Sequence, residues 1–164
     1  FCLTVGTGIG GSFILDGNVY RGNTGSACEI GYMLDGNISF QDRGSMKTLV
    51  DHIRNKKCDL SWTGERIFSS AKQGDPDCVE AIISMLDSLA RGISNVCYVL
   101  NPKVVVLGGG FTGQGQWLEE EIRKNIKKYL LPIIFDNMEF KFALYKNDAG
   151  MIGAFYNFKN RQNL

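Results

Sequence analysis

A glycine-dense turn between two short apolar runs is the segment best suited to chemistry. Residues 3–15 read Leu-Thr-Val-Gly-Thr-Gly-Ile-Gly-Gly-Ser-Phe-Ile-Leu, which predicts a β-hairpin whose tip holds Gly6, Thr7, Gly8 and Gly10. Glycine permits positive φ and lets a ligand approach the main chain. Converging N–H groups in such a turn bind anions, phosphate above all. The alternative is a hairpin that needs glycine only for its turn, and the segment is not a Walker A loop because no Gly-Lys-Ser/Thr follows.

A second glycine group follows an apolar run late in the chain. Residues 103–107 (Lys-Val-Val-Val-Leu) lack alternation, which predicts a buried and parallel strand. Gly108, Gly109 and Gly110 come directly after it. Ligands of open α/β sheets bind beyond the carboxyl ends of parallel strands, where this group is expected to lie. A tight turn between a strand and a helix is the alternative.

Hydrophobic spacing predicts the elements that position these two groups. Residues 1–21 indicate three short strands with a turn at 16–18, and residues 22–44 are irregular. Capping residues Ser45, Thr63 and Asp75 each precede a predicted helix, and the third helix runs from Pro76 to an end at Asn101. Apolar residues at three- and four-residue steps predict that this long helix is buried in the domain.

The second half of the chain is predicted to alternate strands and helices. A helix over residues 117–131 and a strand over 138–144 follow the glycine group, and Asp148 is expected to cap a last helix that runs to about 161. Together the pattern predicts an α/β fold with a mixed sheet and flanking helices. The aromatic residues Phe155, Tyr156 and Phe158 are expected to lie in the core and at a domain contact.

Composition excludes several classes of protein. With 44% hydrophobic and 21% charged residues, the 164-residue chain is ordinary for a globular domain. A net charge of +1 gives no electrostatic case for nucleic acid, and the two basic clusters fall on predicted helices as solvated faces. No apolar run is long enough for a membrane span. Five widely spaced cysteines indicate free thiols in a reducing cytoplasm, so we predict a cytoplasmic protein.

The chain begins inside a strand-like run, at Phe1, without an initiator methionine. We therefore expect that residues 1–164 form a single domain of a longer protein and that a region precedes them.

Several segments together resemble one family, the ROK sugar kinases and their repressor relatives. Residues 4–11 look like its second phosphate-binding hairpin, and residues 20–31 look like its sugar-binding segment. The Gly-Asp-Pro at 74–76, residues 101–110 and residues 147–154 resemble the start of its long helix, its adenosine-binding stretch and its last helix. Each motif is weak alone, but the ordered set covers nearly the whole chain.

The resemblance implies an actin-like, ribonuclease H-like fold, of which this chain is the C-terminal domain. It implies ATP held by the hairpin, with the Thr7 hydroxyl on a phosphate and adenine against the second glycine group. It also implies a sugar bound by Glu29, whose carboxylate can accept from two hydroxyls. The first phosphate motif, the catalytic aspartate and most of the Mg²⁺ site belong to a preceding domain, so we assign no catalytic base here. Asp35, Asp42 and Asp148 lack the context of that base.

One departure from the family is sharp. Most members bind zinc through a histidine and three cysteines, and here Tyr32 stands at the histidine position while Ile38, Phe40 and Ser45 stand at the cysteine positions. A structural zinc site needs four N or S donors, so we predict no zinc. Lys47 replaces a glutamate that contacts sugar in many members. The zinc-less pattern resembles kinases that act on β-glucosides or N-acetylmannosamine.

Two functions remain open at this stage. The first is an ATP-dependent sugar kinase whose C-terminal half is inactive alone, and the second is a sugar-responsive repressor with a DNA-binding region before residue 1. A non-catalytic sugar or nucleotide binder is a third, weaker alternative. The intact hairpin favours the kinase. Members of the family commonly form dimers, so the resemblance also implies a possible homodimer. His52, off the apolar face of its helix, is expected in solvent, and Trp117 is expected to pack rather than bind a ligand.

Overall fold

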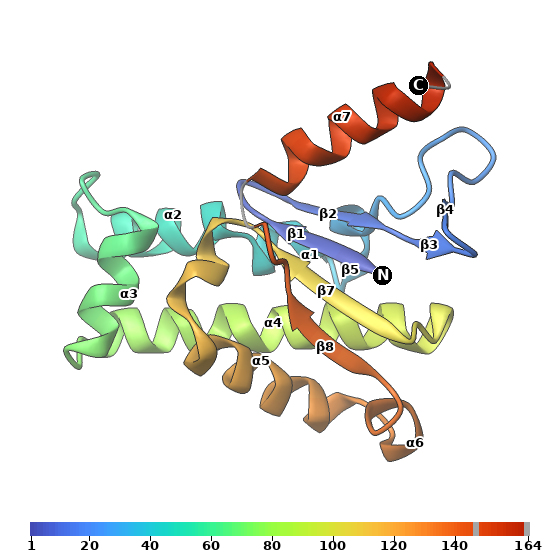
Figure 1. The fold of residues 1–164 in the computed structure, drawn as a ribbon. Coiled ribbons are helices and arrows are strands. Elements are labelled where there is room, and N and C mark those ends of the chain that lie inside the picture. The colour runs from blue at the N-terminus through green and yellow to red at the C-terminus, as the bar shows by residue number, and fades with distance from the viewer. Residues whose placement is uncertain (146–147, 163–164) are drawn as a thin grey trace.

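A four-stranded mixed sheet lies at the centre of the structure, which is a computed structural model and describes residues 1–145 and 148–162 (Figure 1). Its strand order is β2-β1-β7-β8. The antiparallel pair is β1 (Cys2–Val5) with β2 (Ile9–Ser12), and β7 (Val104–Gly108) runs parallel to both β1 and β8 (Glu139–Phe142). The predicted α/β class, mixed sheet and parallel strand are confirmed.

One face of this sheet forms part of the core. Leu3, Val5, Val105 and Leu107 are fully buried on that face. The residues between them along each strand are less buried, and Thr4 is exposed. The predicted burial of β7 is therefore confirmed in full for one face only, since Val104 and Val106 on the other face are partly buried, and an all-apolar sequence cannot show which face is the better covered.

The longest helices lie on one side of the sheet, two more lie beyond one of its ends, and the last helix stands apart above it (Figure 1). The helices are α1 (Phe40–Gly44), α2 (Met46–Lys57), α3 (Gly64–Lys72), α4 (Pro76–Leu100), α5 (Gln116–Tyr129), α6 (Pro132–Phe135) and α7 (Ala149–Arg161). Short 3₁₀ helices η1 (Ile30–Tyr32) and η2 (Gly110–Gln114) and the hairpins β3–β4 (Ile14–Leu15, Asn18–Val19) and β5–β6 (Leu34–Asp35, Ile38–Ser39) complete the fold. The first 21 residues thus contain four strands, not the predicted three.

Local capping explains where the middle helices begin. The Ser45 side chain accepts from the N–H of Thr48, and the Thr63 side chain accepts from that of Arg66. Asp75 accepts from two N–H groups at the start of α4. These three predicted caps are confirmed. Asp148 makes no such bond, so its predicted cap is wrong, and Asn147 before it lies outside the described residues.

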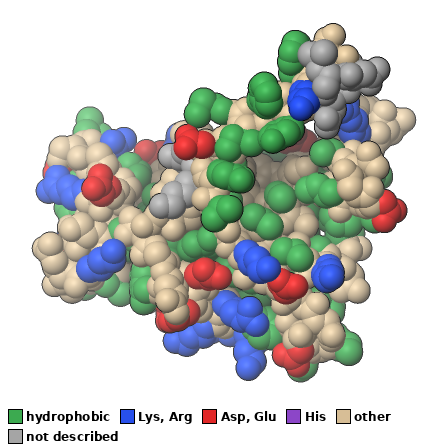
Figure 2. Space-filling model, in the orientation of Figure 1, with side chains coloured by type: hydrophobic (Ala, Val, Ile, Leu, Met, Phe, Trp, Pro, Cys, Tyr) green, Lys and Arg blue, Asp and Glu red, His purple; other side chains and the backbone are tan. Residues whose placement is uncertain are grey.

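The last helix is largely uncovered. Figure 2 shows hydrophobic side chains along α7, and Phe155, Tyr156 and Phe158 are each more than half exposed. The expectation that they belong to the core is wrong for the described residues, because α7 lies apart from the sheet and helices (Figure 1). Their expected role in a domain contact stays a prediction.

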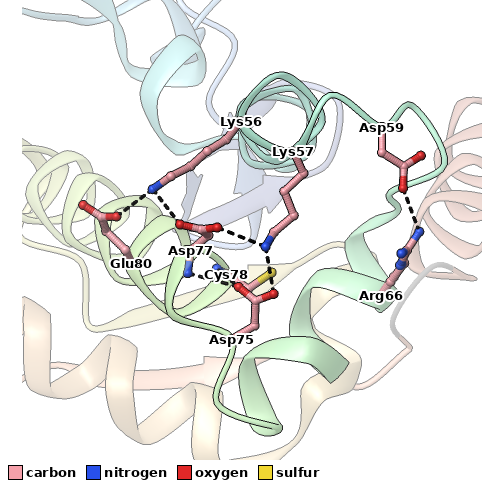
Figure 3. A network of polar contacts seen from close by, with 8 residues as sticks. All are labelled: Lys56, Lys57, Asp59, Arg66, Asp75, Asp77, Cys78 and Glu80. Carbon is pink, nitrogen blue, oxygen red and sulfur yellow. Dashed lines mark hydrogen bonds and ion pairs between the residues drawn. The ribbon is translucent and has the colours of Figure 1, made fainter.

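A network of ion pairs ties the end of α2 to the start of α4 (Figure 3). The Lys57 ammonium lies 2.9 Å from Asp75 and 3.0 Å from Asp77, and the Lys56 ammonium lies 3.0 Å from Asp77 and from Glu80. The hydrogen bond from Lys57 and the Cys78 N–H hold the pKa of Asp75 below its ordinary value. Bonds from both lysines lower the pKa of Asp77 in the same way.

We expect this network to make the free energy of unfolding depend on pH in acidic solution. A carboxylate whose pKa is lower folded than unfolded stabilises the fold above its unfolded pKa, about 3.9, and this contribution disappears as the pH falls through the folded pKa. Asparagine at 75 keeps the helix cap but removes the charge. In urea unfolding from pH 6 to pH 2.5, the stability gap between wild type and Asp75→Asn should therefore narrow with falling pH. The exposed Asp16→Asn serves as control, and a gap that stays constant would contradict the assignment.

Gly92, in the middle of α4, is dictated by packing. A Cβ atom there would lie 2.2 Å from the Phe40 ring. We expect Gly92→Ala to destabilise by about 1–3 kcal/mol through overpacking, although alanine improves helix propensity by about 1 kcal/mol. Gly153→Ala in α7 meets open space and should be neutral or stabilising. Chemical denaturation checks both, and a Gly92→Ala protein as stable as wild type would refute the packing argument.

Candidate functional site

The tip of the β1–β2 hairpin is bare main chain at the carboxyl end of β1. Gly6 and Thr7 are exposed, and the last strand pair is Val5 with Ile9. The Gly6 N–H donates to the Gly8 carbonyl at 2.9 Å, so this amide is occupied by the turn itself. Among the backbone hydrogen bonds of the described residues, none uses the N–H of Thr7 or Gly8. The tip therefore offers two amides and one hydroxyl to a ligand.

Gly109 brings the end of β7 against this hairpin. Its φ is +116°, and a Cβ atom there would lie 2.1 Å from the Val5 carbonyl oxygen. Only glycine meets both conditions. Gly109 and Gly110 consequently border the same cavity as the hairpin, whereas Gly108 is buried within β7 and does not line it.

Glu29 reaches the cavity through a second close approach. A Cβ atom on Gly31 would lie 2.3 Å from the Ile9 carbonyl oxygen, so η1 presses directly against β2. Ile30 is buried beneath, while Glu29 is exposed and its side chain caps no helix. Among the described residues, Glu29 is the one carboxylate that lines this cavity of about 470 Å³.

Gln41 also borders this cavity, and the sequence did not predict it. Its Oε1 atom would lie 2.9 Å from a Cβ on Gly8 and 3.0 Å from a Cβ on Gly31, so two glycines leave room for one amide. Gln41 and Tyr32 line the cavity together with the predicted residues. No short motif announces Gln41, because its place depends on α1 packing beside segments 10 and 33 residues earlier in the chain.

A second cavity, of about 490 Å³, lies across the hairpin tip. Val5, Gly6, Thr7 and Gly110 line both cavities, and the last three form the ridge between them. The second cavity is otherwise lined by side chains and backbone from α2, α3 and η2. Besides Val5, its apolar members are Met46, Phe68 and Phe111, and Glu65 and Gln114 are its longer polar ones. A cavity with apolar members beside two unused amides has the chemistry to take a flat heterocycle that carries phosphates.

The residues at the expected zinc positions do not fit a metal. Phe40 is buried against Gly92, and Ser45 is buried and caps α2. Tyr32 and Ile38 are exposed and offer no thiolate or imidazole. Within residues 1–145 and 148–162, no three His, Cys, Asp or Glu side chains gather as a metal site would require.

Other sequence candidates lie away from the site. Asp35 pairs with Arg91 at 3.1 Å, and Asp42 accepts a hydrogen bond from Ser39, so neither borders the hairpin cavity. His52 is exposed, as predicted. Trp117 is 46% exposed beside an apolar groove and packs less than expected. No helix in the described part of the chain is long and apolar enough to cross a bilayer.

Comparison with known proteins decides the family. The model of the ROK family matches residues 1–161. This chain belongs to the ROK family. The resemblance noted from the motifs and the actin-like class are thereby confirmed, since its structural neighbours are ROK kinases of that fold.

Individual relatives show how much of a ROK protein is present. An uncharacterized protein of Clostridium perfringens, CPE0188, is 42% identical over 99% of this chain and 56% of its own length. A β-glucoside kinase of Listeria innocua is 28% identical over 99% of this chain and 57% of its own. The crystal structure of a ROK family protein from Streptococcus pneumoniae in complex with sucrose has a TM-score of 0.87 at 28% identity, over 99% of this chain and 58% of that one. The chain thus spans a little over half the length of these relatives.

Proposed function

We propose that this ROK chain is the nucleotide- and sugar-binding half of an ATP-dependent sugar kinase. The observation that carries the proposal is the single cavity that joins the bare amides of Thr7 and Gly8 to the carboxylate of Glu29. Phosphoryl transfer is largely positioning and charge neutralisation. A site that places phosphate donors beside a sugar acceptor meets that requirement.

The two cavities suggest how the substrates divide. The nucleoside occupies the apolar cavity bounded by Phe68 and Phe111, and its phosphates cross the ridge at Gly6 and Thr7. The sugar lies in the other cavity, where the Glu29 carboxylate accepts from its hydroxyls. ATP therefore points its terminal phosphate from one cavity toward the other.

This half supplies binding and orientation but no general base. Glu29 lines the cavity in which the sugar is proposed to lie, and a side chain that accepts from sugar hydroxyls orients the acceptor rather than removing its proton. The base and most of the Mg²⁺ ligands are assigned to a preceding domain of a longer protein. Mg²⁺, when bound, would neutralise charge on the phosphates. Residues 1–164 alone should accordingly show no turnover.

The test is a panel of hexoses, hexosamines and β-glucosides assayed for ATP turnover with the full-length protein. Phosphorylation of one class supports the kinase and names its substrate. If every sugar is inert while the protein retards an operator DNA, the chain belongs to a sugar-responsive repressor instead. Turnover by the 164 residues alone would refute the placement of the base elsewhere.

A further inference from the structure

Three buried polar atoms in the described part of the chain have no hydrogen-bond partner, and all three belong to one cavity. They are Nε of Arg43, Nε of Arg91 and Oγ of Ser94. The three residues line the same space of about 280 Å³. Native structures pair nearly all buried polar groups, so three exceptions in one place need an explanation. Ser94 is only 2% exposed, so bulk solvent does not meet its need.

This cavity is separate from both cavities at the hairpin. It lies between the β5–β6 hairpin, α1 and α4, with Tyr129 of α5 at its side, and shares no lining residue with the others. Helix α1 forms the partition. Gln41 lines the Glu29 cavity, while Phe40 and Arg43 of the same helix line this one.

Positive charge exceeds negative charge on the lining. Its charged members are Arg43, Arg91 and Asp35, a net charge of +1. Asp35 pairs with Arg91 through Nη1 at 3.1 Å, but the two Nε atoms have only longer contacts, 3.7 Å from Arg43 Nε to Asp35 and 3.4 Å from Arg91 Nε to Asp87. Both guanidinium side chains remain 37% exposed, so a ligand in the cavity can reach them.

The nearby acceptors are already engaged. Asp87, which does not line the cavity, accepts from the Tyr129 hydroxyl at 2.6 Å. The Tyr98 hydroxyl donates to the Tyr129 carbonyl and accepts from the Leu131 N–H. The groups left without a hydrogen-bond partner are therefore mainly donors, above all those of the guanidinium groups. Such donors bind a negatively charged ligand that is rich in acceptors.

Size and lining restrict that ligand further. A cavity of about 280 Å³ is small for a nucleotide but adequate for a compact metabolite. Met33, Leu34 and Phe40 add apolar surface beside the guanidinium groups. A bare ion would leave this surface unused, whereas a short carbon skeleton would cover it.

We propose that this cavity binds a small organic oxyanion, a carboxylate or a phosphate monoester on a short carbon skeleton. The site does not depend on the proposed kinase function, because it shares no residue with the cavities that carry that function.

Calorimetric titration of the full chain at constant ionic strength tests the proposal. The probes are glycerol 3-phosphate, lactate and inorganic phosphate, with glycerol as the uncharged comparison. Glycerol 3-phosphate or lactate should bind saturably, and the one that binds identifies the oxyanion. Arg91→Gln should weaken that binding at least tenfold, whereas Arg123→Gln on the exposed face of α5 should leave it unchanged. Gly6→Ala in the phosphate hairpin should also leave it unchanged, which separates the two sites.

Ser94→Ala keeps the proposal testable if Arg91→Gln fails to fold. Removing an unpaired buried hydroxyl should raise the thermal midpoint while weakening probe binding at least threefold. A purely structural serine would not produce that combination. Absence of binding by every probe, or equal affinity in wild type and either Arg91→Gln or Ser94→Ala, would overturn the site and leave a hydrated cavity.

Discussion

Glutamine in place of Glu29 is expected to reduce kcat/KM for sugar phosphorylation about 100-fold or more in the full-length protein. A hydrogen bond to a charged group contributes about 1.5–3 kcal/mol, and this carboxylate is placed to accept two. Glutamine has nearly the same shape but only one carbonyl oxygen as acceptor. The sugar KM should rise, and kcat should fall as well if the carboxylate orients the reacting hydroxyl.

Steady-state kinetics with sugar and ATP varied separately measure this effect. The ATP KM should stay within about twofold, because the nucleoside cavity contains no part of Glu29. Glu120→Gln, an exposed carboxylate on α5, is the matched control and should behave as wild type. If Glu29→Gln retained the sugar KM and kcat of the parent, the sugar would have to bind elsewhere. The oxyanion site at Arg43 and Arg91 would be untouched by that result.

The parts of the fold predicted well are those governed by neighbours in sequence. Ser45, Thr63 and Asp75 each cap a helix through an N–H two or three residues later. Asn101 ends α4, as the Asn-Pro dipeptide predicts, and it does so in the left-handed conformation that asparagine tolerates. Such contacts involve one turn of chain, so the residue types alone specify them. Asp148 shows the limit of the rule, since a favourable residue type does not guarantee the bond.

The parts predicted poorly depend on distant segments. Phe40 is buried because Gly92, 52 residues later, leaves space for its ring. The last helix has the aromatic content of a core helix, yet Phe155 and Phe158 find no cover within the described residues. Local composition cannot distinguish a side chain that packs against its own domain from one that awaits another partner.

The residues of the candidate site also differ in whether local sequence or distant segments determine their positions. The motifs predicted the hairpin, Glu29 and Gly110 together, and the structure brings all three to one cavity. The motifs could not separate glycines that face the cavity from glycines that the neighbouring backbone requires. Gly109 is required by the Val5 carbonyl, and Gly108 lies inside a strand. Gln41 has no signal of its own, since its position follows from the space that two other glycines leave.

We expect Gly6→Ala to weaken ATP binding strongly while the protein still folds, because Gly6 faces the cavities rather than a neighbouring backbone segment. A Cβ atom at Gly6 meets nothing within 4 Å, so the methyl group enters the space beside the ridge between the two cavities. The phosphates are proposed to cross that ridge against the main chain. A displacement of about 1 Å in a reacting group can cost about 100-fold in rate, so in the full-length protein we expect the ATP KM to rise about tenfold or more and kcat to fall.

The experiment compares Gly6→Ala with two other glycine variants. Gly153→Ala also enters open space, but on α7, and should be at least as stable as wild type with an unchanged ATP KM. Gly109→Ala should fail to fold, because its Cβ would lie 2.1 Å from the Val5 carbonyl oxygen in a backbone conformation that alanine avoids. Circular dichroism then shows which glycine the fold requires, and ATP-dependent kinetics show which glycine ATP binding requires. A folded Gly6→Ala protein with an unchanged ATP KM would mean that the phosphates lie away from the hairpin, and the ridge would lose its proposed role.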